Sequence, residues 1–326
     1  MRTAFKSAAT AALVLSLLVA ATVACAATPG SGPAEKKHRF IETADEMDAE
    51  EQLREEARHR VRVRNWEGLE VRLRERLEAI ERLADQGELD EAIEEAEQCA
   101  DENPDEPEVE EYVRELRERK EKKQLHERVK ALLRLAVSDS AGALEQLKAF
   151  LVEHPGNAEA LRAIAGIEEE RGRFKEAAEA LEGAVESDPR NQTLYGNLKR
   201  VYAAMGDRSP KVFVNGKRPA FDVPPVIVSG KTVVPIRAIA SALGAAIEWR
   251  EETREIVISK GETTIVLQLE NRVAVVNGQE MQLDVPPRSV NGRALVPLRF
   301  VGEALHCDVG YDDASGVITV ADSVQE

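Results

Sequence analysis

Residues 221–249 read FDVPPVIVSGKTVVPIRAIASALGAAIEW, and residues 283–312 repeat the pattern as LDVPPRSVNGRALVPLRFVGEALHCDVGYD. The two stretches align without a gap at an offset of 62 residues. The same offset carries Asn215-Gly216 onto Asn277-Gly278 and Trp249 onto Tyr311. Residues 211–322 therefore contain two copies of one structural unit, at 211–259 and 274–321.

Each copy combines the signals of short strands with those of one short helix. Asn-Gly predicts a hairpin turn, because both central residues of that turn need positive φ. The two prolines of Asp-Val-Pro-Pro cannot donate to a central ladder, which predicts a place at a sheet edge. Val-Pro-Ile-Arg predicts a helix start with Pro near the first turn. The first helix would bury Ile236, Ile239, Ala240 and Leu243, and strands are predicted near 246–249, 255–259, 264–269 and 272–276.

The two quoted strings resemble the copper amine oxidase N-terminal domain family, also called the stalk domain, over about residues 211–321. The resemblance implies a small antiparallel sheet folded on a helix, found as an accessory module in exported bacterial proteins. The copper ligands and the Tyr-derived quinone of the oxidase belong to a separate catalytic domain, which nothing here matches. Whether the two copies form one domain or two stays open at this point.

Two charged residues recur in both copies, as Asp222 and Arg237 and again as Asp284 and Arg299. One interpretation makes them ligand contacts. The interpretation that we favour is structural, with each Arg tying the Pro-Pro segment or a helix end through hydrogen bonds.

Before residue 208 the chain has a helical repeat. Asp188-Pro189 follows His154-Pro155 by 34 residues, and residues 158–191 read AEALRAIAGIEEERGRFKEAAEALEGAVESDPRN. The next unit, from Gln192, has its first helix only. An earlier unit ends at Asn103-Pro104, and the 51 residues from Pro104 to Pro155 predict a lengthened first helix in the middle unit.

This pattern resembles the tetratricopeptide repeat family over about residues 69–207. Such units bury their apolar faces only against neighbours, so the fold class is an all-α helical solenoid followed by a small, internally duplicated α+β domain of antiparallel strands on short helices. The resemblance implies a groove, formed by the first helices, that grips proteins or peptides. By repeat position its residues would include Arg162, Asn197 and Arg200, and the alternative is that these are ordinary exposed polar residues.

The first 26 residues read as an export signal. Arg2 and Lys6 precede an apolar run that ends at Ala24-Cys25-Ala26, which is typical of a signal peptidase site. Cys25 also fits lipidation, and the two alternatives, lipoprotein and free secretion, stay open. Residues 27–68 are expected to form a linker and a charged leading helix, with Arg58-His59-Arg60 on a solvated face. The only membrane contact expected is a lipid anchor at Cys25.

Composition excludes several function classes. The net charge is −16, of which residues 211–326 carry −3 and residues 1–210 the other −13, so nucleic-acid binding is not expected. No catalytic, cofactor or metal motif occurs, and His306-Cys307 is the one adjacent pair of soft ligands. Cys99 and Cys307 are interpreted as small core residues.

The leading hypothesis is therefore a non-enzymatic, exported cell-envelope adaptor without a cofactor. Its helical repeats would bind a protein or peptide, and its duplicated domain would contact another envelope protein or a cell-wall polymer. Two alternatives remain: a structural surface spacer that self-assembles, and, less favoured, a copper-handling protein.

Overall fold

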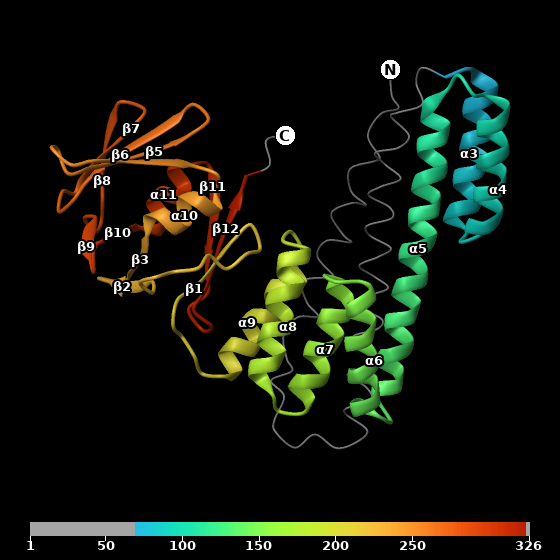
Figure 1. Cartoon of the computed structure of the whole chain (residues 1–326), viewed down its shortest axis with the longest axis horizontal. Helices are drawn as coiled ribbons and strands as arrows, with labels where there is room; N and C mark the ends of the chain where they lie inside the picture. The colour runs from blue at the N-terminus through green and yellow to red at the C-terminus, as the bar shows by residue number, and fades with distance from the viewer. Residues whose placement is uncertain (1–68, 324–326) are drawn as a thin grey trace, which may run out of the picture. The chain divides into compact units, whose positions relative to one another are not determined.

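The computed structural model of the chain describes residues 69–323 (Figure 1). The expected signal segment, Cys25, and the linker with the charged leading helix lie outside the described residues. Among residues 69–323, no helix combines the length and the apolar character that crossing a membrane requires.

The first part of the described chain is a helical array of alternating first helices and second helices, here called A and B helices. The A helices are α3 (Val71–Asp85), α5 (Pro107–Ala136), α7 (Ala158–Glu170) and α9 (Gln192–Ala204). The B helices are α4 (Leu89–Glu102), α6 (Ser140–Glu153) and α8 (Phe174–Ser187). Asn157 and Asn191 cap α7 and α9, since each side-chain oxygen accepts a backbone N–H of the first turn. The helix α9 has no B helix after it.

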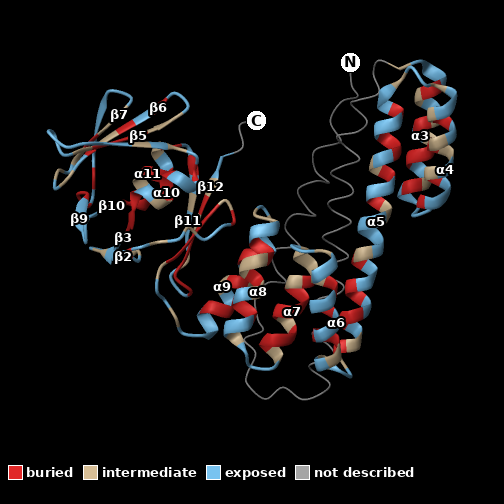
Figure 2. Cartoon of the chain, in the orientation of Figure 1, coloured by how far each residue is buried: buried red, intermediate tan, exposed pale blue. Residues whose placement is uncertain are grey.

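The long helix α5 joins two separate cores, and its 30 residues confirm the predicted lengthening of the middle unit. Its first half packs Val109, Tyr112 and Leu116 against α3 and α4. Its second half packs Val129 and Leu133 against α6 and α7. Figure 2 shows the buried residues on the facing sides of these helices. The inserted residues therefore extend one helix between two packing sites.

The second part is the duplicated domain, with twelve strands and two short helices among its described residues. Its elements are β1 (Lys211–Val214), β2 (Val226–Val228), β3 (Lys231–Pro235), α10 (Ile236–Ala242), β4 (Ala246–Arg250), β5 (Glu255–Lys260), β6 (Thr263–Gln268), β7 (Val273–Val276), β8 (Gln279–Gln282), β9 (Arg288–Val290), β10 (Arg293–Pro297), α11 (Leu298–Ala304), β11 (Cys307–Tyr311) and β12 (Val317–Asp322). The predicted helix face is confirmed, since Ile236, Ile239, Ala240 and Leu243 are all buried. The Asn-Gly turns also have the expected positive φ in both copies.

The two copies meet in a central sheet of order β2-β3-β10-β9. Strands β3 and β10 pair antiparallel, with Val234 opposite Val296. These two valines are counterparts at the 62-residue offset, so a local two-fold axis passes between them. The Pro-Pro segments precede β2 and β9, which are the edge strands, as the sequence predicts.

One core serves both copies, so they form a single domain. A cluster of buried residues mixes the first copy (Ile236, Ile258) with the second (Leu298, Ile318). Strand β1 of the first copy also pairs with β12 of the second, in parallel. This pairing differs from the antiparallel sheet that the family resemblance implies. In the three-stranded sheet β1 takes the place beside β12 that β6 takes beside β5, the counterpart of β12, in the five-stranded sheet.

The repeated carboxylates bridge the two copies. Asp222 pairs with Arg293, and Asp284 pairs with Lys231 at 2.6 Å, and these partners are themselves counterparts at the same offset. The interpretation that Arg237 and Arg299 tie the Pro-Pro segments or helix ends is wrong. Both are exposed, and neither has a hydrogen bond or ion pair within the described part of the chain. Each arginine is the second residue of its helix and points to solvent, so the bridging cations come from β3 and β10 instead.

Candidate functional site

The A helices present a face of charged and polar side chains, which is the candidate partner-binding face. On α9, Arg200 forms an ion pair with the buried Glu169 of α7 and a hydrogen bond of 3.4 Å to Asn197. The Arg200 side chain keeps 40% of its surface exposed. Two of the three predicted groove residues therefore lie together, and Glu169 orients the guanidinium that faces solvent.

The third predicted residue, Arg162, lies on α7 and is buried, and it takes part in polar interactions. A second polar link on this face joins His126 of α5 to Glu159 of α7 at 3.0 Å. Buried charged groups are held by partners because an unpaired charge inside a protein costs several kcal/mol. This face is thus ordered by cross-helix pairs before any partner arrives.

The duplicated domain covers the apolar side of α9, where a B helix would otherwise lie. Phe213 of β1 is fully buried in one cluster with residues of α8 and α9, and Val317 of β12 joins it. The ring of Phe213 meets that of Tyr195 edge-on, with centroids 6.4 Å apart. The array and the duplicated domain therefore share a core at this junction.

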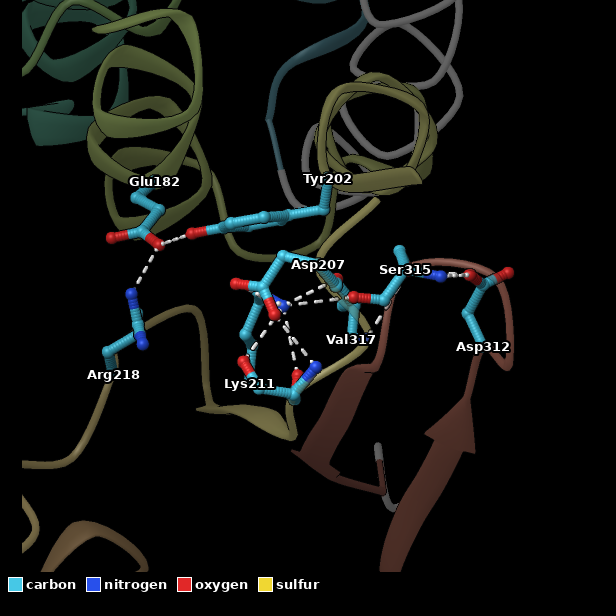
Figure 3. Close-up of polar contacts among 9 residues, drawn as sticks. Glu182, Tyr202, Asp207, Lys211, Arg218, Asp312, Ser315 and Val317 are labelled. Atoms are coloured by element: carbon cyan, nitrogen blue, oxygen red, sulfur yellow. Dashed lines mark hydrogen bonds and ion pairs between the residues drawn. The ribbon is translucent and has the colours of Figure 1, made fainter. Parts of the chain in front are cut away.

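Lys211 is the polar centre of the junction (Figure 3). Its Nζ donates to the carbonyl oxygens of Asp207 and Ser209, each at 2.9 Å, and of Ser315 at 3.2 Å. It also lies 4.5 Å from the centre of the Tyr202 ring, and only 3% of the residue is exposed. Burial lowers the pKa of Lys211, and the Asp207 carboxylate opposes this shift. One ammonium group thus joins α9, the connecting segment and the loop before β12.

A second polar contact lies beside Lys211 in Figure 3. The hydroxyl of Tyr202 donates to Glu182 of α8, and Arg218 of the duplicated domain pairs with the same carboxylate at 2.7 Å. Burial, followed by the bond to Glu182, raises the pKa of Tyr202. Lys217 adds an exposed pair to Glu186 at 3.4 Å. The junction is therefore held by apolar burial and by two cross-module charge contacts.

Asp207 gives the junction a testable pH dependence. Hydrogen bonds from Ser209, and then the Lys211 ammonium, lower the pKa of Asp207 from 3.8 to about 2. Because the folded-state pKa is depressed, the ionised group stabilises the fold above about pH 4, and this stabilisation is lost as the pH falls towards 2. Asp207→Asn should therefore lower the free energy of unfolding by about 0.5–1 kcal/mol at pH 7, since the side chain is partly exposed, and have no effect at pH 2.

Urea unfolding at several pH values measures this difference. Asp308→Asn is the control, because it removes the same charge from an exposed residue of β11 for which no partner exists among residues 69–323. A pH-independent effect of Asp207→Asn would contradict the assignment of this carboxylate to the junction.

Both parts of the described chain match known protein families. Residues 213–320 match the copper amine oxidase N-terminal domain. Residues 128–191 of the array match a tetratricopeptide repeat. Both resemblances seen in the sequence are confirmed, and the tetratricopeptide repeat comes first along the chain. Tetratricopeptide repeats are modules of protein–protein interaction, and the copper amine oxidase N-terminal domain is a non-catalytic module.

A segment of 91 residues is 32% identical to a protein of Brevibacillus choshinensis called "Protease inhibitor". The match covers 28% of this chain and 27% of that protein. The chain thus spans about a quarter of the length of the curated relative that it matches.

The two cysteines of the described chain lie in its cores, as predicted. Cys99 and Cys307 are buried and unbridged, and burial raises the pKa of Cys307 to about 11, so its thiol stays protonated. His306, its neighbour, is exposed. Among the residues that the structure describes, no group of three His, Cys, Asp or Glu side chains could hold a metal ion.

The junction residues were missed by sequence reasoning. Three of them, Lys211, Phe213 and Arg218, lie in or just after the first strand of the duplicated domain, and no motif marks them in the sequence. One signal was present: the last repeat has a first helix only, and its apolar face, with Leu198 and Tyr202, needs a cover. The sequence could therefore predict that something packs on α9, although it could not name the strand.

Proposed function

We propose that this protein is a non-enzymatic, exported cell-envelope adaptor. Its tetratricopeptide array binds a protein or peptide through the A-helix face, and its copper amine oxidase N-terminal-like domain contacts a wall polymer or another envelope protein. The observation that carries the proposal is the junction, where two non-catalytic modules share a core. Export is proposed from the basic and apolar residues 1–26 alone.

The A-helix face offers hydrogen-bond donors to such a partner. The Arg200 guanidinium donates to Glu169 and keeps part of its surface in solvent, beside the Asn197 amide. A fixed guanidinium favours carboxylates and peptide carbonyls, because several donors lie in one plane. Packing of Phe213 and Val317 against the cluster that includes α9 holds this helix in place without a B helix. A preorganised face loses less entropy when a peptide binds.

A displayed library of random peptides tests this role on the full chain, purified from the envelope of a bacterium that expresses it. Intact mass would first show a start at Ala27 or a lipidated Cys25 if the N-terminal residues direct export. The wild type should then enrich a shared peptide motif. Arg200→Ala and Asn197→Ala should each weaken binding of that motif about tenfold, the effect of one charge-assisted hydrogen bond.

Lys175→Ala on the B helix α8 is the matched control, because its side chain is 80% exposed and its one ion pair within residues 69–323 is with Glu179 at 3.8 Å. It should leave the enrichment unchanged. No enrichment by the wild type, together with self-association at rising concentration, would favour the structural spacer instead. Equal loss in Lys175→Ala and Arg200→Ala would contradict the A-helix face as the site.

A second candidate function follows from the similarity to the Brevibacillus protein, namely inhibition of a protease. Only a quarter of that protein is matched, so the similarity gives a reason to assay the chain and no residue to mutate. Inhibition of a serine, cysteine, aspartic or metallo-protease at stoichiometric concentration would support it. Unchanged rates with one protease of each class would remove it.

A further inference from the structure

The two copies of the duplicated domain differ in how far the Pro-Pro segment is covered. In the second copy Leu283, Pro286 and Pro287 are buried. Their counterparts in the first copy are less covered: Phe221 and Pro225 are half-buried and Pro224 is exposed. The segment then leads into β2, where Val226 is 39% and Ile227 51% exposed. The same sequence motif is therefore covered in one copy and open in the other.

The cover of the second copy is the connection between β6 and β7. The backbone N–H of Glu270 donates to the carbonyl of Pro287 at 2.8 Å. The carbonyl of Arg272 accepts the N–H of Leu283 at 2.7 Å, and its guanidinium donates to the carbonyl of Asp284 at 2.8 Å. Three hydrogen bonds thus seat a tight turn, in which Glu270 has a φ of 62°, on the Pro-Pro motif.

The first copy has the same three backbone groups without that segment. Within residues 69–323, no hydrogen bond is made by the N–H of Phe221 or by the carbonyls of Asp222 and Pro225. These groups stay open because of the topology. Strand β1 pairs directly with β12, and no connection between two described strands lies on the Pro-Pro motif of the first copy.

We propose that the open Pro-Pro motif of the first copy, residues 221–227, binds a turn of a partner protein that has the same conformation as residues 269–272. The segment would donate one backbone N–H to the Pro225 carbonyl. An arginine two residues later would accept the Phe221 N–H through its carbonyl and donate its guanidinium to the Asp222 carbonyl. The positive charge of the arginine suits the site, since the Asp222 carboxylate lies there, paired with Arg293. Main-chain bonds supply affinity, and the charge-assisted bond of the arginine supplies specificity.

This site lies wholly in the duplicated domain and is independent of the A-helix face. The peptide-library experiment can therefore fail while this site stands, and the reverse is also true.

The test uses the full 15N-labelled chain and a synthetic peptide of its own residues 266–275, VLQLENRVAV. In the free chain the Phe221 amide should exchange with solvent faster than its counterpart, Leu283. The peptide should slow exchange at Phe221 and shift its resonance, while Leu283 stays unchanged. A peptide with alanine in place of the arginine should bind about tenfold more weakly, because a charge-assisted hydrogen bond is lost.

Two matched protein variants complete the test. Val226→Glu places a charge on the exposed edge of the first copy and should abolish the shift of Phe221. Arg288→Glu places a glutamate at the equivalent residue of the second copy and should leave peptide binding intact. Pro224→Glu is a second variant at the open site, should Val226→Glu lose its fold.

The proposal is overturned if the Phe221 amide is already protected in dilute free chain, or if both peptides bind equally. If protection of the Phe221 amide rises with protein concentration alone, the segment that binds there comes from a second copy of this chain. That result would also overturn the proposal of a partner protein.

Discussion

Gly216→Ala should destabilise the protein by about 2–4 kcal/mol, whereas Gly278→Ala, the equivalent change in the second copy, should cost about 1–2 kcal/mol. Both glycines have positive φ, at 82° and 83°, so both substitutions strain the Asn-Gly turn alike. A Cβ on Gly216 would also lie 2.5 Å from the Val185 carbonyl and 2.6 Å from the Pro189 Cβ. Around Gly278 there is nothing within 4 Å. The difference between the variants therefore isolates the close approach at the junction.

Urea unfolding of the full chain measures this difference, with helix and strand signals followed together. Hydrogen exchange adds a local readout, because Gly216→Ala should raise exchange rates in α8, α9 and β1 above those in β7. If both alanine variants lose the same stability, the clash does not exist in solution and the junction is looser than the structure places it.

Phe213→Ala should cost about 3–5 kcal/mol, the range for truncating a buried phenylalanine. The ring is fully buried and belongs to the cluster that joins α8, α9 and β12, so its loss leaves a cavity between the modules. Calorimetry of the wild type should show helices and strands at the junction melting in one transition. In Phe213→Ala the array should melt first, because its last helix has lost its cover.

Val275→Ala is the matched control, since Val275 is the counterpart of Phe213 at the 62-residue offset and is only half-buried on β7. It should cost about 1 kcal/mol and keep the single transition. Two transitions in the wild type, or a loss below 1 kcal/mol in Phe213→Ala, would contradict a shared core.

Much of the fold could be predicted because its signals are local. The Asn-Gly turns, the helix after Val-Pro-Ile-Arg and the lengthened α5 each depend on residues close together in the chain. Positive φ, helix starts and apolar periodicity act within a few residues, so sequence patterns report them directly. The duplication also predicts that the Asn-Gly turn and the short helix occur in both copies.

The partners of charged residues could not be predicted in the same way. Asp222 and Arg237 recur together, yet Asp222 pairs with Arg293 from the other copy, and Arg237 points to solvent. The cation that meets Asp222 is 71 residues away in the chain. A repeated pattern shows that two residues are kept in register, and it does not show whether they touch, because the fold exchanges partners across a two-fold axis.

The sequence by itself determined the two modules, their order, the positions of their turns and helices, and the buried faces of those helices, because short-range sterics and periodicity act along the chain. Only the tertiary structure decided that both copies share one core, that β1 pairs in parallel with β12, and that Phe213 and Lys211 cover α9. These contacts join residues far apart in sequence, and several strands of similar composition could have filled each place. Packing of the whole molecule determines which strand fills each place, and it leaves the Pro-Pro motif of the first copy open.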